Sequence, residues 1–123
     1  MHLVFYAQQV DYSEALGGDI VNVSFQEKPD DKIDYGKSGA PTPPLIKYVL
    51  ISAYYEESSA KIVEWCDEEE FDRSESIEQI ELSRTLIKLT LKNGVSCEVS
   101  FRTDDITFHR IKSFLLDDGV PSL

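Results

Sequence analysis

The chain has 123 residues, of which 41% are hydrophobic, so it can form one domain whose core needs no disulfide or metal. Its 23 acidic and 12 basic residues give a net charge of −11. This excess of acids argues against binding to nucleic acids or to anionic membranes, because both need clustered Lys and Arg. We therefore expect a single domain over residues 1–123.

The N-terminal residues show no secretory pattern, and the longest strongly apolar run, residues 48–55, is too short for a membrane-spanning helix. Cys66 and Cys97 lie far apart in the sequence and match no zinc module. We expect two reduced, buried thiols in a cytoplasmic protein. A disulfide between them remains an alternative if their Cα atoms lie within about 7 Å of each other.

The first predicted strand is residues 3–7, whose apolar residues on both faces suggest that both are covered. The second is residues 19–27, where Val21, Val23 and Phe25 alternate with polar residues. Residues 28–44 follow, with four prolines and two glycines, and predict a long loop. Such a loop is either functional or a solvated connector.

Residues 45–56 are apolar on both faces and predict a central strand. Residues 61–66, 77–82 and 85–91 predict three further strands, with an acidic loop over residues 67–76.

The next hairpin allows its register to be predicted. A two-residue turn at Asn93 and Gly94 would place Leu91 and Leu89 opposite polar residues, whereas opposite residues share a face of the sheet. A three-residue loop over residues 92–94 instead pairs Leu91 with Val95, Leu89 with Cys97 and Ile87 with Val99. We therefore predict a type I turn followed by a left-handed glycine at position 94.

The sequence Thr103-Asp104-Asp105 is typical of a helix N-terminus, because their side chains can accept free backbone N–H groups. Phe108, Ile111 and Leu115 then fall on one face, with Phe114 beside them, and predict an amphipathic helix over about residues 104–117. The summed pattern predicts an α+β fold: a mostly antiparallel sheet of six to seven strands with this helix packed on one face.

Motifs for chemistry are missing from the sequence. It contains no phosphate-binding glycine loop and no nucleophile elbow. His109 is expected on the polar side of the helix, and His2 at the terminus, so neither suggests a catalytic triad. The contiguous acids from Asp67 to Asp72 lack the spacing and the glycine of a calcium loop. We therefore expect no enzymatic activity, no catalytic residues, no cofactor and no metal site.

The charge distribution is more informative. Residues 56–81 contain eleven acidic and two basic residues, a net charge of −9 out of −11 for the chain. A concentrated acidic surface attracts a basic partner, although such a surface can also serve solubility alone. The candidate partner-binding residues are Glu64, Asp67, Glu68, Glu69, Glu70, Asp72 and Glu75.

From Tyr48 onward the chain follows the order YVLISAYY, IVEWCDEEEF, IEQIELSRTLIKLTL, CEVSFR and ITFHRIKSFLLDD. This order resembles small immunity proteins of bacterial polymorphic-toxin and contact-dependent growth inhibition systems. The resemblance implies a cytoplasmic protein that binds and blocks one cognate toxin and carries no catalytic residues. A basic nuclease is one candidate toxin. A regulatory adaptor domain or a small enzyme or ligand-binding domain stays an alternative, as do both a monomer and a weak dimer.

Overall fold

The computed structural model describes residues 2–15, 17, 19–28, 46–54, 61–68 and 71–116, and the side chains of all of these except 71–75. Most of the predicted loop over residues 28–44 lies outside this described part. The described elements are β1 (His2–Ala7), β2 (Gln9–Ala15), β3 (Ile20–Gln26), β4 (Lys47–Tyr54), β5 (Lys61–Asp67), β6 (Phe71–Leu82), β7 (Leu86–Leu91), β8 (Ser96–Phe101) and α1 (Asp105–Leu116).

All described strands join one sheet in the order β1-β8-β7-β6-β5-β4-β3-β2. Neighbours are antiparallel except β1 and β8, which are parallel. The α+β class with one C-terminal helix is confirmed, but the prediction of six to seven strands is wrong: the sheet has eight, with mixed pairing. The strand missed by the sequence analysis is β2, which lies at one end of the sheet and buries none of its side chains fully.

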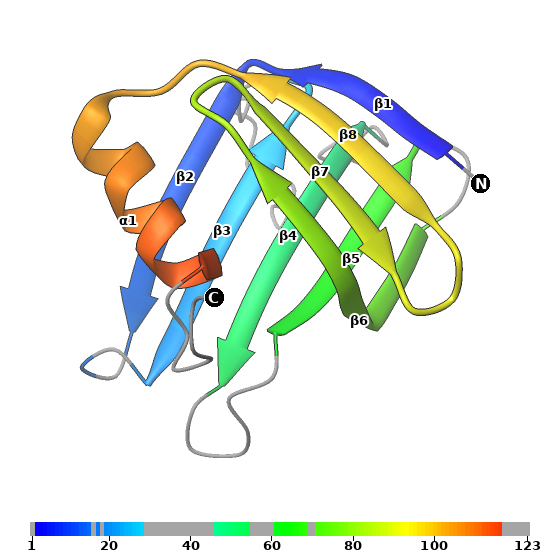
Figure 1. Ribbon diagram of the computed structural model, residues 1–123, viewed down its shortest axis with the longest axis horizontal. Helices are drawn as coiled ribbons and strands as arrows, with labels where there is room; N and C mark the ends of the chain where they lie inside the picture. Colours follow the sequence, from blue (N-terminus) through cyan, green and yellow to red (C-terminus); the bar gives the residue numbers. More distant parts are fainter. Residues whose placement is uncertain are drawn as a thin grey trace, which may run out of the picture.

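The sheet folds over on itself, so that β2 to β5 face β7 and β8 across the core (Figure 1). The long strand β6 passes between the two layers, and its pairing shifts register against both β5 and β7. Such irregularities increase twist and allow a sheet to curl. The rings of Phe25 and Phe101, 5.2 Å apart, join the two layers in the core.

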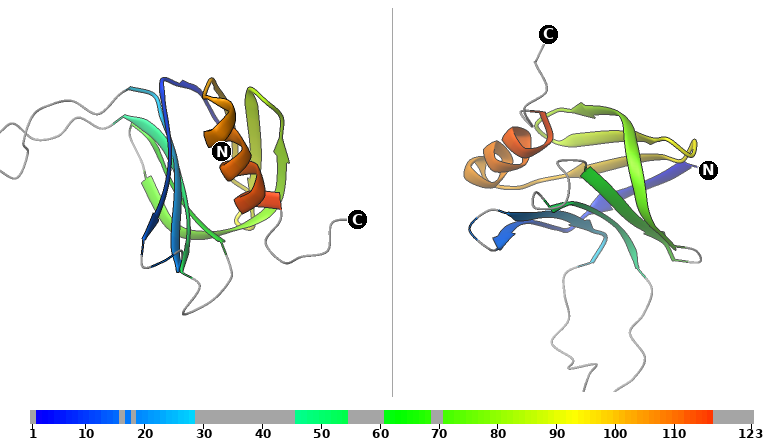
Figure 2. Two further views of the ribbon diagram at one scale, coloured as in Figure 1. Left: turned by 90° about the vertical axis from the view of Figure 1, so that its left-hand side faces the viewer. Right: turned by 90° about the horizontal axis from the view of Figure 1, so that it is seen from below.

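The helix α1 covers the open side between the two layers (Figure 2). Its buried residues are Ile111, Phe114 and Leu115, and the Phe114 ring meets Tyr12 of β2 edge-on at 6.5 Å. The predicted apolar face is confirmed. In the described part of the chain, no helix has the length and apolar character needed to cross a membrane.

Asp104, one of the three residues expected at the helix N-terminus, caps α1. Its carboxylate accepts the backbone N–H of Thr107 at 2.7 Å and the Thr107 hydroxyl at 2.9 Å. These hydrogen bonds hold the pKa of Asp104 below its ordinary value. Arg84 stabilises the same N-terminal end of α1. Its guanidinium contacts Asp105 at 2.7 Å and lies 4.8 Å from the centre of the Phe108 ring.

The predicted C-terminal hairpin is confirmed. Leu89 pairs with Cys97 and Ile87 with Val99, and the Leu91 N–H donates to the Val95 carbonyl at 2.8 Å. Gly94 takes a φ of 91°, the left-handed conformation that the three-residue loop requires.

Two local predictions are wrong. Residues 71–76 belong to β6 and not to an acidic loop over 67–76, because a high density of charged residues does not by itself exclude a strand. The register shift between Ile77 and Gln79 also breaks the alternation that would have revealed the strand. The outer face of β1 is not covered, since Val4 and Tyr6 are about half exposed.

Candidate partner-binding surface

Acidic residues are frequent along β5 and β6. In each strand, alternate side chains point to the outer face of the sheet. On β5, Val63 and Trp65 point into the core, so Glu64 lies on the outer face. The Tyr48 hydroxyl of the neighbouring strand β4 donates a hydrogen bond to the Glu64 carboxylate. Glu64 is therefore held in place on the sheet.

The turn after β5 begins at Glu68, an exposed residue with a left-handed backbone at φ 85°. This conformation is uncommon for residues other than Gly, Asn and Asp. Asp67, immediately before it, is the last residue of β5 and pairs with Lys47 of β4. The described acids of this region thus run from the outer face of β5 to its end.

Lys61 is one of the two bases within the acidic stretch, but it lies on the opposite face of β5. Its side chain is 9% exposed, and its Nζ atom lies 5.1 Å from the centre of the Phe114 ring on α1. This cation–π contact stabilises the packing of the helix. Because Lys61 points inward, it cannot pair with Glu64 on the outer face.

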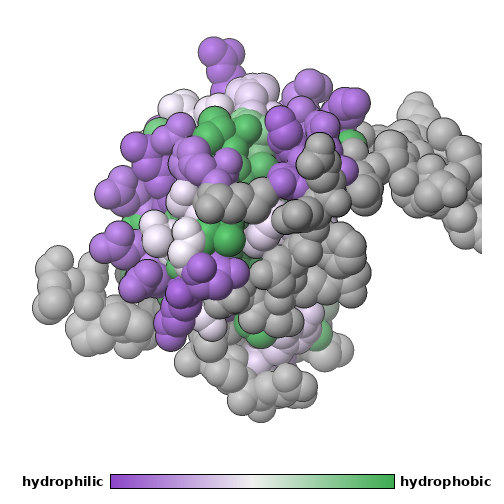
Figure 3. Space-filling view, turned by 90° about the vertical axis from the view of Figure 1, so that its right-hand side faces the viewer, coloured by the Kyte–Doolittle hydropathy of each residue, from purple (hydrophilic) through white to green (hydrophobic). Residues whose placement is uncertain are grey.

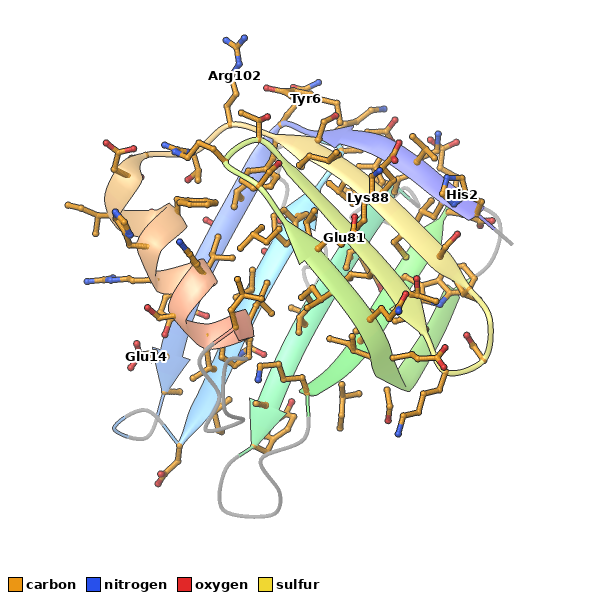
Figure 4. All side chains as sticks on the ribbon, viewed as in Figure 1. His2, Tyr6, Glu14, Glu81, Lys88 and Arg102 are labelled. Carbon is orange, nitrogen blue, oxygen red and sulfur yellow. The ribbon has the colours of Figure 1, made fainter. Side chains whose placement is uncertain are left out.

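The outer face of the other layer is partly neutralised. Glu81 of β6 pairs with Lys88 of β7, and Lys88 pairs with Glu98 of β8. The Lys88 Nζ atom lies 3.6 Å from the Glu98 carboxylate, and Figure 4 shows Glu81 and Lys88 close together on adjacent strands. A base also lies beside the end of β5, because Lys47 of β4 pairs with Asp67.

The predicted site residues are only partly brought together by the described structure. Glu64, Asp67 and Glu68 follow one another along β5 and its end, but Asp67 falls at the same alternate positions as Val63 and Trp65, on the other face from Glu64. Asp72 and Glu75 have backbones in β6 that pair with Trp65 and Val63, respectively. Their side chains, and the whole of Glu69 and Glu70, lie outside the described residues. The inward orientation of Lys61 was not predicted, although its alternation with Val63 and Trp65 in the sequence indicates it.

Other kinds of site find less support in the described residues. A shallow hollow of about 170 Å³ lies beside the start of β7, which is smaller than a typical ligand pocket. No described group of three or more His, Cys, Asp or Glu residues could hold a metal ion. His109 is exposed on α1, and the His2 ring bonds the Ser96 hydroxyl at 2.5 Å on the outer face of the sheet.

Both cysteines are buried and unbridged. Cys97 lies in the core, where burial raises the pKa of its thiol to about 11, so it remains protonated and a poor nucleophile at neutral pH. Neither thiol therefore suggests a reactive site.

Hydrophilic side chains cover much of the described part of the face shown in Figure 3, with small hydrophobic areas between them. Comparisons with protein-family models, with curated proteins and with solved structures give no match to this chain.

Proposed function

We propose that this protein is an immunity protein that binds one bacterial toxin in the cytoplasm and blocks its active or substrate-binding surface without catalysis. The contact is the acidic surface, made up of Glu64, Asp67, Glu68, Glu69, Glu70, Asp72 and Glu75. The observation that carries the proposal is the uneven charge: eleven acids and two bases between residues 56 and 81. One of these bases, Lys61, is turned into the core.

The chemistry of the partner follows from this charge. A toxin that cleaves nucleic acids needs a basic surface to hold phosphates. Carboxylates arranged on a sheet can occupy that surface in place of the phosphates and exclude the substrate. Opposite charges also accelerate the encounter of the two proteins, which suits an inhibitor that must act before the toxin does.

Co-purification with the protein encoded by the adjacent upstream gene tests the proposal. We expect a stable complex in which the toxin loses its activity. Binding can be followed by the fluorescence of Trp65, the single tryptophan of the chain, which lies between Glu64 and Cys66 and is 4% exposed. A complex that leaves the neighbouring protein fully active would favour the adaptor alternative, and the absence of a complex would contradict the proposal.

A further inference from the structure

We propose that the free edge of β1 joins two copies of this chain, edge to edge, in a dimer with one continuous sheet. β1 lies at one end of the strand order and pairs with β8 along one edge only. Among the described residues, no strand pairs with its other edge. A free edge presents unpaired N–H and C=O groups that a further strand can bond.

The two edge strands of the sheet differ in how well their sequences prevent pairing with another chain. Soluble proteins commonly place charged residues or proline on a free edge strand to prevent pairing. β2, at the far end of the sheet, carries Asp11 and Glu14. β1 has the sequence HLVFYA, with no acid, lysine, arginine, proline or glycine. Edge-to-edge association is therefore expected at β1 and disfavoured at β2.

The side chains of β1 support the same assignment. Leu3, Phe5 and Ala7 are buried in the core, whereas Val4 and Tyr6 on the outer face are 49% and 48% exposed. These two are among five large hydrophobic residues that are exposed in the described part of the chain. The free edge thus combines an unpaired backbone with an apolar outer stripe.

A second copy suits this edge because the strand is complementary to itself. Two identical strands related by a two-fold axis pair antiparallel. With the axis at Phe5, Val4 of each copy lies opposite Tyr6 of the other, and aromatic residues pair favourably with β-branched ones across strands. Leu3 then lies opposite Ala7, so apolar side chains remain together on the inner face as well.

Charge also favours a second copy at this edge. Each chain carries a net charge of −11, so two copies repel each other over most surfaces. β1 brings no acid of its own to the contact. Glu98, which pairs with Val4 on β8, is itself 3.6 Å from Lys88. The β1 edge is thus a place where two acidic copies can meet with little repulsion.

Sedimentation equilibrium over two decades of protein concentration tests the dimer. We expect the dimer fraction to rise with concentration and with added NaCl, because salt screens the repulsion between the two copies. Val4→Lys and Tyr6→Lys should each weaken association by at least about tenfold, since each loses an apolar pair and brings like charges close across the axis. Ser13→Lys adds the same charge on exposed β2 and should leave association unchanged.

Circular dichroism of each variant confirms that the fold is retained. A wild-type protein that stays monomeric at every concentration would overturn the proposal, as would equal weakening by Ser13→Lys. This test does not depend on the proposed toxin. Added NaCl should weaken the binding of the acidic surface to a basic partner, whereas it should strengthen the dimer.

A crosslink tests the register. In the Phe5-centred pairing, Val4→Cys combined with Tyr6→Cys places thiols from the two copies directly opposite each other, within reach of a disulfide. Oxidation should give a covalent dimer, while Asp11→Cys with Ser13→Cys, the equivalent pair on β2, should not. The native cysteines are buried and should not compete. Equal crosslinking of both double variants, or of neither, would contradict the proposed pairing.

Discussion

At the scale of single residues, Glu68 is the one residue other than glycine that has a positive φ in the described part of the chain. Its φ of 85° is a left-handed conformation that costs an L residue with a Cβ roughly 1–2 kcal/mol. Glycine adopts this conformation freely but loses more chain entropy on folding. We therefore predict that Glu68→Gly raises the free energy of unfolding by about 0.5–1 kcal/mol, measured by urea denaturation.

Glu14 provides the matched control, because it is an exposed glutamate at a regularly paired position of strand β2. Glu14→Gly removes the same charge and should instead lower the free energy of unfolding. If both variants lost stability equally, Glu68 could not have the left-handed backbone. A more stable Glu68→Gly variant that binds its partner less well would indicate that the glutamate is kept for its charge.

Asp104 should make stability depend on pH. Its pKa is lowered from an ordinary value of 3.8, chiefly by the hydrogen bond from the Thr107 backbone. The folded protein therefore favours the ionised carboxylate, which contributes stability above about pH 4 and loses it as the pH falls through the lowered pKa. We predict that Asp104→Asn melts below wild type at pH 7, and that the difference shrinks toward pH 2.

Thermal melts of the two proteins at several pH values provide the measurement. Asp105, next in the chain, is exposed and bonds Arg84 and not the helix N-terminus. Asp105→Asn therefore controls for loss of one carboxylate at this place. A difference between Asp104→Asn and wild type that stayed constant from pH 7 to pH 2 would contradict the role of the ionised carboxylate.

At the scale of elements, the hairpin between β7 and β8 gives the sharpest prediction. A Cβ at Gly94 would meet no atom within 4 Å, so any cost of substitution comes from its φ of 91° and not from a clash. Gly94→Val should lower the free energy of unfolding by about 1 kcal/mol or more, and Gly94→Asn by clearly less. Asn93→Ala should cost only about 0.5 kcal/mol, through loss of the bond from the Val95 N–H to the Asn93 side chain at 3.0 Å.

Thermal and urea unfolding of the three variants would distinguish the two turn types. In a two-residue turn of type I′, Asn93 would need a positive φ as well. Comparable losses for Asn93→Ala and Gly94→Val would therefore contradict the three-residue loop and the pairing of Leu89 with Cys97.

The sequence predicted those elements whose faces differ clearly in polarity. In β3, Val21, Val23 and Phe25 are buried and alternate with half-buried polar residues, so a period of two was visible. In α1, the sequence Thr103-Asp104-Asp105 and the apolar face indicated where the helix starts and which side is buried. β2 escaped prediction because an edge strand packs less against the core and needs no such regular contrast.

At the scale of the whole molecule, the parallel pairing of β1 with β8 could not be predicted. It joins the two ends of the chain, with Leu3 opposite Cys97, and no local pattern fixes a pairing across that distance. The same limit applies to the candidate site. The excess of acids was evident from the sequence, but the inward position of Lys61 and the ion pair of Lys88 depend on the folded sheet.

The central claim is that the acidic surface binds a basic toxin. Its most direct test is the association rate constant with the partner at low and high salt, for wild type and for Glu68→Lys, Glu69→Lys and Glu70→Lys combined. A control that changes Asp11, Glu14 and Asp19 to Lys alters the net charge equally at another place. We predict slower association and a weaker salt dependence for the first triple variant, and much smaller changes for the control. An unchanged rate constant at low salt would contradict the claim.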